Sequence, residues 1–215
     1  MVPQLSGSEA VKKRWIAAIV LLITSVLAAL SYNYWDVPLA YYCKELSRSV
    51  LDIAEIVTIT GESRWYYILF VPAYVVLRFV VKNKLWSMRI LFLFIAISAS
   101  GLINMLIKWL AGRNRPINLF NSGLFGFDHF GMMYESTSFP SGHAVTVFTL
   151  AAAISILFPR WSFPAFAAAM IIGASRIIIT SHYLSDVLAG AGIGILCTLA
   201  VKYFFDRCNV KLARN

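Results

Sequence analysis

Charged residues are scarce in this sequence. They make up 13% of the 215 residues, whereas hydrophobic residues make up 60%, and a soluble domain of this length needs more polar surface to cover its outside. Internal repeats, low-complexity tracts and proline-rich linkers are absent as well. These absences exclude a soluble multidomain protein and predict a single membrane domain that spans residues 1–215.

The sequence contains six long apolar runs. Each has roughly 17 to 23 mostly apolar residues, enough to cross about 30 Å of hydrocarbon as a helix with its backbone hydrogen bonds satisfied. The fourth run is the shortest, and its alanines and β-branched residues suit a helix packed inside a bundle. The sequence predicts an all-α, polytopic membrane protein, a six-transmembrane-helix bundle with spans at 15–32, 65–81, 88–110, 143–158, 163–180 and 187–205.

Acidic residues are also few: 10 Asp and Glu stand against 19 Lys and Arg, which gives a net charge of +9. A nucleic-acid-binding surface would gather these cations on one face, with aromatic residues between them. Instead the cations are sorted by the topology of the six spans, and twelve of the 19 fall on one side of it, at Lys12, Lys13, Arg14, Arg78, Lys82, Lys84, Arg89, Arg160, Lys202, Arg207, Lys211 and Arg214. The positive-inside rule makes that side cytoplasmic. We therefore expect both termini in the cytoplasm and no nucleic-acid partner.

Cysteine is limited to Cys43, Cys197 and Cys208. The number is odd, and the six-span topology puts the three residues in an outer loop, inside a span and on the cytoplasmic side, so no disulfide framework is predicted. The basic leader and the first apolar run are similar to a cleaved signal peptide. Because the run is long and aromatic anchors flank it, we favour a retained span.

Three polar stretches interrupt the apolar sequence, and the six-span topology brings all of them to the outer side. They are Lys108 with Arg115-Pro116 seven residues later, Pro140-Ser141-Gly142-His143, and Ser175-Arg176 with His182 and Asp186 downstream. Three fixed cations, two imidazoles and one carboxylate supply charge neutralisation, a nucleophile, an acid and an orienting group. This combination predicts covalent phosphoryl transfer without a metal.

The cations have plainer interpretations when each is taken alone. Lys108 near a helix end is typical of a snorkelling lysine, and Arg115 of an interfacial anchor. Seven residues are two helical turns, however, and Gly112 and Pro116 indicate that the helix frays or turns there, so both side chains can converge on one anion. Arg176, at membrane depth with no acidic partner nearby in sequence, is a further candidate because its guanidinium can bind two phosphate oxygens.

The Pro-Ser-Gly-His stretch is typical of a helix start, with Ser141 as a cap and Gly142 permitting close backbone approach. Free amides at such a start suit a phosphate oxygen. His182 and Asp186 are four residues apart, which allows the carboxylate to accept the Nδ1 proton and leave Nε2 as a nucleophile. Metal binding is the other interpretation, but no third ligand stands at a recognisable spacing and three cations would repel a metal. No metal or cofactor is predicted.

Together the patterns K-x6-R-P (108–116), P-S-G-H (140–143) and S-R-x5-H-x3-D (175–186) resemble the type 2 phosphatidic acid phosphatase family, whose site is related to that of vanadium haloperoxidases. All three patterns match without departure. The six spans are similar to the layout of the family's bacterial membrane members, and they disfavour a haloperoxidase. The resemblance implies a phosphatase core at about residues 88–205.

The resemblance also implies a role for each residue. His182 would attack phosphorus to give a phosphohistidine, with Asp186 holding its tautomer, and His143 would protonate the leaving group and then activate water. The phosphate oxygens would be held by Lys108, Arg115, Ser141, Gly142 and Arg176. Because His182 must begin neutral and His143 protonated, we expect a bell-shaped dependence of the rate on pH.

The implied function is hydrolysis of a lipid phosphate at the outer, periplasmic face of a bacterial inner membrane. The substrates to consider are phosphatidylglycerophosphate, phosphatidate, undecaprenyl diphosphate and lipid A phosphate. A phosphotransferase with a lipid acceptor, and a lipid-binding protein or transporter, are the alternatives. The outer loop at 117–139 is rich in aromatic residues and methionine, which suit either contact with a lipid chain or simple packing. Gly190, Gly192 and Gly194 indicate a helix-contact face in the last span.

Overall fold

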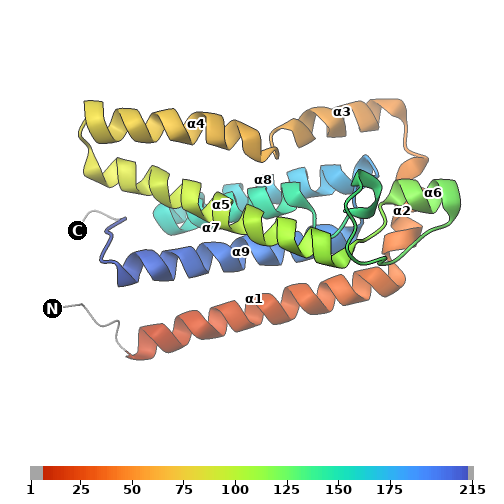
Figure 1. Ribbon diagram of the computed structural model, residues 1–215, viewed down its shortest axis with the longest axis horizontal. Coiled ribbons are helices and arrows are strands. Elements are labelled where there is room, and N and C mark those ends of the chain that lie inside the picture. The colour runs from red at the N-terminus through yellow and green to blue at the C-terminus, as the bar shows by residue number, and fades with distance from the viewer. Residues whose placement is uncertain (1–6, 213–215) are drawn as a thin grey trace.

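The computed structural model describes residues 7–212, and over this range the chain forms helices and no β-sheet (Figure 1). In chain order they are α1 (Gly7–Tyr34), α2 (Asp36–Lys44), α3 (Arg48–Ile59), α4 (Ser63–Val75), the π-helix η1 (Val76–Val80), α5 (Lys84–Ala111), α6 (Pro116–Ser122), the short 3₁₀-helix η2 (Tyr134–Ser136), α7 (Gly142–Leu157), the 3₁₀-helix η3 (Pro159–Trp161), α8 (Ser162–Ile178) and α9 (Leu184–Arg207). The predicted all-α class is confirmed.

Four helical segments are long and apolar enough to cross a membrane: Arg14–Tyr34, Lys84–Ala111, Pro159–Ile178 and Leu184–Arg207. They coincide with four of the six predicted spans. The fourth predicted span corresponds to α7, which has 16 residues, and the second to α4 followed directly by η1. Pro72, which lacks a backbone N–H, lies one turn before this π-helix. The chain is a polytopic membrane protein, and the count of six spans stays a prediction.

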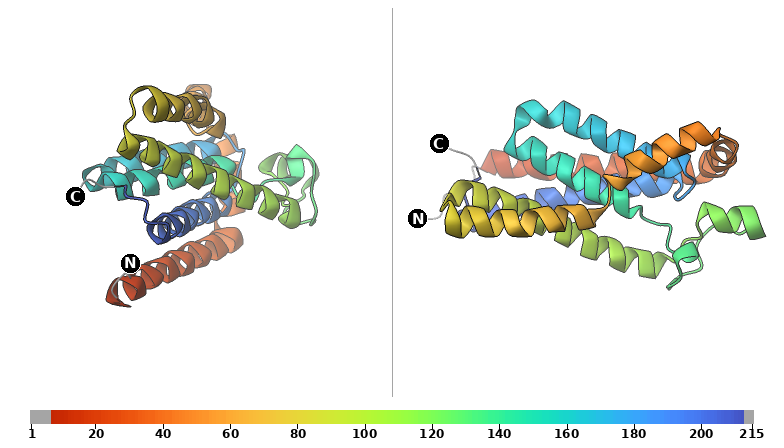
Figure 2. Two further views of the ribbon diagram at one scale, coloured as in Figure 1. Left: turned by 60° about the vertical axis from the view of Figure 1, so that its left-hand side comes forward. Right: turned by 90° about the horizontal axis from the view of Figure 1, so that it is seen from above.

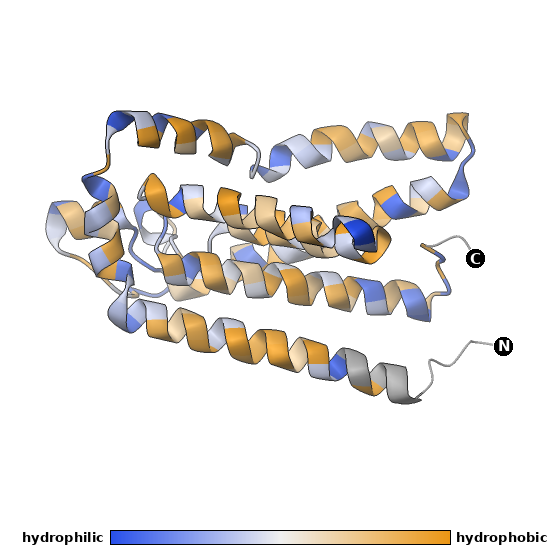
Figure 3. Cartoon of the chain, turned by 180° about the vertical axis from the view of Figure 1, so that it is seen from behind, coloured by the Kyte–Doolittle hydropathy of each residue, from blue (hydrophilic) through white to orange (hydrophobic). Residues whose placement is uncertain are grey.

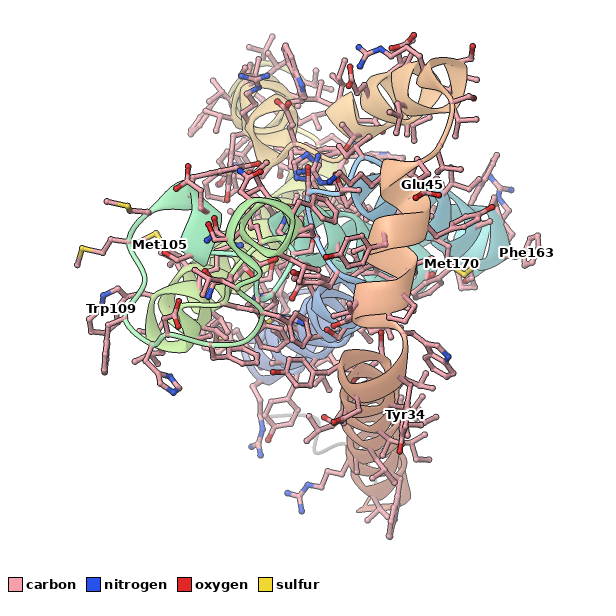
Figure 4. All side chains as sticks on the ribbon, turned by 90° about the vertical axis from the view of Figure 1, so that its right-hand side faces the viewer. Tyr34, Glu45, Met105, Trp109, Phe163 and Met170 are labelled. Carbon is pink, nitrogen blue, oxygen red and sulfur yellow. The ribbon has the colours of Figure 1, made fainter. Side chains whose placement is uncertain are left out.

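Apolar side chains cover the outside of the bundle. Met105 and Trp109 of α5, and Phe163 and Met170 of α8, point away from the neighbouring helices (Figure 4), and Phe163 is 84% exposed. Hydrophobic residues occupy the middle of the long helices, whereas hydrophilic residues gather toward their ends (Figure 3). An apolar surface of this extent marks contact with hydrocarbon rather than with water.

The helix α7 lies at the centre of the bundle, packed against α5, α8 and α9. The contact with α9 depends on glycine, because a Cβ atom on Gly194 would lie 2.6 Å from the carbonyl oxygen of Val145. Gly190 lies equally close to the start of α7, and Gly192 faces Thr24 of α1 on the opposite side. The predicted helix-contact face is therefore confirmed, and it serves two neighbours.

The two ends of the bundle differ in composition and structure. α1 begins and α9 ends at one end, whereas α2, α6 and the segment 123–141 form the other (Figures 1 and 2). The connection at 34–64 is mostly helical, since it contains α2 and α3. These helices have 9 and 12 residues, too few to be recognised as spans from apolar length alone.

Candidate active site

The two cations of the first polar stretch meet at the end of the bundle that contains α2 and α6. α5 ends after Ala111, where Gly112 adopts a left-handed conformation with φ 58°. This turn brings Arg115 back toward Lys108. Lys108 Nζ donates a hydrogen bond to the carbonyl oxygen of Thr137 at 2.6 Å, and Arg115 Nη2 donates to the same oxygen at 3.3 Å. Both side chains thus converge on one point.

Arg115 is held by the backbone of two separate segments. Its Nε donates to the carbonyl oxygen of Tyr134 at 2.7 Å, and its Nη1 donates to that of Ser181 at 2.9 Å. The guanidinium also lies 3.9 Å from the centre of the Tyr134 ring. These contacts aim Nη1 at His182, whose Nε2 is 3.4 Å away.

The contact with Arg115 favours one tautomer of His182. An arginine side chain can only donate hydrogen bonds, so Nε2 is the unprotonated nitrogen and the proton belongs on Nδ1. Nδ1 faces Oδ2 of Asp186 at 3.6 Å, which is longer than a hydrogen bond and typical of catalytic pairs without substrate. Burial, together with the charge of Arg115, lowers the pKa of His182 to about 3 against the opposing effect of Asp186. The imidazole is therefore a neutral base with its lone pair on Nε2.

Asp186 is fixed in the first turn of α9 by partners from three segments. Its Oδ2 accepts hydrogen bonds from the backbone N–H of Tyr183 at 2.9 Å and from Ser138 Oγ at 2.6 Å. Its Oδ1 accepts from Arg113 Nη1 at 2.5 Å. The side chain is fully buried, so the carboxylate has no freedom to turn away from His182.

The start of α7 is tied to the same segment. The N–H of Ser141 donates to the carbonyl oxygen of Asp186 at 3.0 Å, and Gly142 begins the helix. Ser141 occupies the predicted N-cap position, but its hydroxyl makes no capping bond and has no partner among the residues described. His143 follows in the first turn, where Gly61 packs so closely that a Cβ there would lie 2.8 Å from Cδ2 of His143. A buried hydroxyl without a partner in the described chain suits a polar substrate.

Arg176 lies in the last turn of α8 and is buried. Its Nη1 donates to Thr58 Oγ1 at 2.8 Å, so its partner comes from α3 and is neutral. Nε of the same guanidinium is buried with no hydrogen-bond partner in the described part of the chain. Part of this cation therefore stays available to an anion.

Arg113, the largest fully buried side chain in the described chain, was not among the predicted site residues. The guanidinium bonds to Asp186 and, through Nη2 at 2.6 Å, to Asp36 of α2. The two carboxylates raise the pKa of Arg113 even though burial lowers it. The sequence offered a weak signal, because an arginine and an acid both lie in loops of the predicted outer side, where other charged residues also occur. Nothing in the spacing, however, pairs residues 36 and 113.

Aromatic rings surround the Arg113 guanidinium within 6.0 Å, from Tyr32, Phe125, Phe127, Phe139 and Tyr183. Three of these rings, those of Phe125, Phe127 and Phe139, belong to the loop at 117–139, so part of that loop packs inside the protein. Met132 and Met133 of the same loop are 83% and 74% exposed. Packing is therefore confirmed for part of the loop, whereas contact of its exposed residues with a lipid chain stays a prediction.

A cavity of about 480 Å³ lies between α1 and α9, lined mainly by apolar side chains such as Leu21, Ala28 and Ile193. Arg113 and Ser185 also line it, whereas neither His143 nor His182 does. This cavity is thus distinct from the cluster of cations and histidines.

Residues 89–209 match the sequence model of the PAP2 superfamily, and all three polar stretches fall within this range. The chain belongs to the PAP2 superfamily. Lipid A 1-phosphatases of Rhizobium etli and Rhizobium johnstonii are each 31% identical to the PAP2 chain over 208 residues. The alignments cover 92% of this chain and 88% and 83% of the relatives. The family resemblance found in the motifs is therefore confirmed, and the PAP2 chain is an integral membrane phosphatase.

Two solved structures share the fold of the PAP2 chain. A transmembrane PAP2-type phosphatidylglycerolphosphate phosphatase from Bacillus subtilis superposes with a TM-score of 0.65 at 22% identity and covers 92% of this chain and 98% of its own. LpxE of Aquifex aeolicus superposes with a TM-score of 0.59 at 23% identity, over 78% of this chain and 94% of its own. The arrangement of helices is thus that of PAP2 membrane phosphatases.

Proposed function

We propose that the protein hydrolyses the phosphate ester of a membrane lipid, without a metal, through a phosphohistidine on His182. One observation carries the proposal. Nε2 of His182 bears the lone pair and lies 3.4 Å from the Arg115 guanidinium, which can hold a phosphate, while Nδ1 faces Asp186. The proposed nucleophile thus has an anion-binding guanidinium at one ring nitrogen and an orienting carboxylate at the other.

The reaction then has two steps. In the first, Nε2 of His182 bonds to phosphorus, the ester P–O bond breaks, and His143 gives its proton to the departing oxygen of the lipid. In the second, His143 takes a proton from water, the resulting hydroxide attacks phosphorus, and the N–P bond breaks. Inorganic phosphate leaves, and both histidines return to their starting states.

Three cations would hold the phosphate oxygens during both steps: Lys108, Arg115 and Arg176. The unused hydroxyl of Ser141 and the free amides at the start of α7, beginning at Gly142, add neutral donors. Charge that develops on the equatorial oxygens would meet fixed donors in a buried site, where electrostatic stabilisation is strongest.

We place the site at the periplasmic face of a bacterial inner membrane. The cations of the predicted cytoplasmic side belong to the start of α1, the turn between α4 and α5, the turn between α7 and α8, and the end of α9. These segments lie at the end of the bundle opposite α2 and α6 (Figure 1). The positive-inside rule supports an outward-facing site at that opposite end.

A lipid A phosphate is the first substrate to test, because lipid A 1-phosphatases are similar to this chain over 92% of its length. Purified protein would be assayed for release of inorganic phosphate from lipid A, phosphatidylglycerophosphate, phosphatidate and undecaprenyl diphosphate, with His182→Ala as the blank. Release from lipid A without a lipid acceptor, unchanged by EDTA, is the expected result. Phosphate transfer only when an acceptor lipid is added would indicate a phosphotransferase, and no phosphate release above the blank from any lipid would reject the proposal.

A further inference from the structure

Asp36 is the first residue of α2, far outside the segment at 89–209 that carries the family match. Its side chain is buried, and both of its oxygens are fully engaged. Oδ1 accepts hydrogen bonds from Ser31 Oγ at 2.7 Å and from the N–H of Ser185 at 3.0 Å. Oδ2 accepts from Arg113 Nη2 at 2.6 Å and from Ser185 Oγ. Four donors from three segments leave this carboxylate a single orientation.

Arg113 lies between this carboxylate and that of Asp186. Its Nη2 is bonded to Asp36, and its Nη1 is bonded to Asp186 at 2.5 Å and to Ser185 Oγ at 2.6 Å. Because a guanidinium is planar and rigid, fixing one end fixes the direction of the other. Asp36 therefore helps to fix Oδ1 of Asp186 through Arg113, while Tyr183 N–H and Ser138 Oγ hold Oδ2 beside His182.

We propose that Asp36 is a positioning residue of the phosphatase reaction, which acts on His182 through Arg113 and Asp186. The inference rests on the proposed function of His182 as the nucleophile. It extends the site beyond the family segment, since the N-terminal part of the chain then supplies a residue that the reaction needs.

Charge gives Asp36 a second effect on the same histidine. The imidazole becomes positive when it bonds to phosphorus, and a buried carboxylate behind it stabilises that charge. Arg113 alone would offset much of the effect of Asp186, because two buried opposite charges in contact carry no net charge. With Asp36 the three buried groups carry a net charge of −1, and that charge remains available to the imidazole.

A purely structural role for Asp36 and the proposed role predict different kinetics. The phosphate-holding side chains of Lys108, Arg115 and Arg176 do not contact Asp36. Loss of the proposed role would therefore lower kcat and leave KM nearly unchanged. The loss of kcat would also require an intact Asp186. If Asp36 had only a structural role, its replacement would lower activity by the same factor with or without Asp186.

The test compares Asp36→Asn, Asp186→Asn and the double variant in phosphate release from the best lipid substrate. Asp52→Asn is the matched control, since Asp52 lies on α3 with 52% of its side chain exposed and pairs only with surface arginine. We expect Asp36→Asn to lower kcat about 10- to 100-fold, the usual effect of losing an outer partner of a functional ligand, with KM changed less than about threefold. In the Asp186→Asn background we expect the same change to lower kcat less than about threefold.

Thermal unfolding of each variant in detergent shows whether it is folded. If Asp36→Asn does not fold, Ser31→Ala takes its place, because it removes only the 2.7 Å hydrogen bond to Oδ1. We then expect a smaller loss of kcat, again absent in the Asp186→Asn background. Equal losses in both backgrounds, or wild-type kcat in a folded variant, would overturn the inference while the proposed function stands. Wild-type protein that releases no phosphate would overturn both.

Discussion

Nε2 of His182 and Nη1 of Arg115 lie 3.4 Å apart, in a part of the protein where both side chains are buried. A cation at this distance attracts an anion to the nitrogen that bears the lone pair. It also disfavours a proton on that nitrogen, because two positive charges would then be in contact. The same contact thus draws phosphate in and keeps the imidazole ready to attack.

Replacement of Arg115 by lysine tests this arrangement. Arg115→Lys keeps the charge but loses the planar fork that bonds to Tyr134, Ser181 and Thr137, so the remaining ammonium cannot occupy all of these positions. We expect kcat/KM to fall about 100-fold, the scale for loss of one fixed donor to a transition-state oxygen. Arg64→Lys is the control, because Arg64 is 67% exposed. Equal activity of the two variants would count against a role for the guanidinium.

The pH dependence of kcat/KM reports the state of His182 in the free enzyme. Burial and the charge of Arg115 lower its pKa to about 3. Only the neutral imidazole attacks, so acidification removes the reactive form only as the pH falls to that value. We therefore expect no acid limb near 6.5, the ordinary histidine value.

A variant separates this effect from titration of the substrate. Arg115→Gln removes a positive charge beside His182 and should move the acid limb to higher pH. The second pKa of the free substrate phosphate is about 6, and it is the same whether the wild type or Arg115→Gln is assayed. An acid limb that stays in place in Arg115→Gln would show that it does not belong to His182.

The sequence alone predicted the features that depend on local composition and spacing. Apolar runs placed five of the six predicted spans within a few residues of single helices, because burial in hydrocarbon depends on composition rather than on partners. The convergence of Lys108, Arg115 and His182 followed from topology alone. The helix break at Gly112 was also predicted, since glycine is the residue that adopts the left-handed conformation found there.

The partners that hold the site residues in place could not be predicted from local sequence. Arg113 meets Asp36 across 77 residues, and Arg176 meets Thr58 across 118. Such pairs form only after the helices pack, and no local periodicity marks them. The prediction of a capping hydrogen bond from Ser141 was wrong: Ser141 occupies the N-cap position that its propensity favours, but its hydroxyl makes no hydrogen bond to the amides of α7.

Thr58 offers a test of how Arg176 is held. Thr58→Val removes the hydroxyl that accepts a hydrogen bond from Nη1 of Arg176 at 2.8 Å and leaves that buried donor unpaired. We expect kcat/KM to fall roughly 10-fold or more, since a hydrogen bond to a charged group contributes about 1.5–3 kcal/mol. Thr58→Ser should retain activity. The control is Thr60→Val, because Thr60 lies one residue beyond the end of the same helix and is exposed. A loss of kcat/KM equal to that of Thr58→Val would indicate general damage to this turn.

Gly194 tests the close contact between α7 and α9. In Gly194→Ala the new Cβ would lie 2.6 Å from the carbonyl oxygen of Val145 and 2.8 Å from the N atom of Thr149, so the helices must separate. We expect a loss of stability of about 1–3 kcal/mol, typical of overpacking, seen as a lower midpoint of thermal unfolding in detergent. Gly101→Ala should melt like the wild type, because the nearest atom to its Cβ is 4.0 Å away. Equal midpoints for both variants would contradict the close contact.

The most direct measurement is to trap the phosphoenzyme. Wild-type protein, His182→Ala and His143→Ala would be mixed with a lipid labelled in its phosphate and quenched in alkali, because an N–P bond is labile to acid. We expect label on His182 in the wild type, more label in His143→Ala with a good leaving group since water is no longer activated, and none in His182→Ala. Phosphate release by His182→Ala at the wild-type rate, or label on another residue, would contradict the assignment of His182 as the nucleophile.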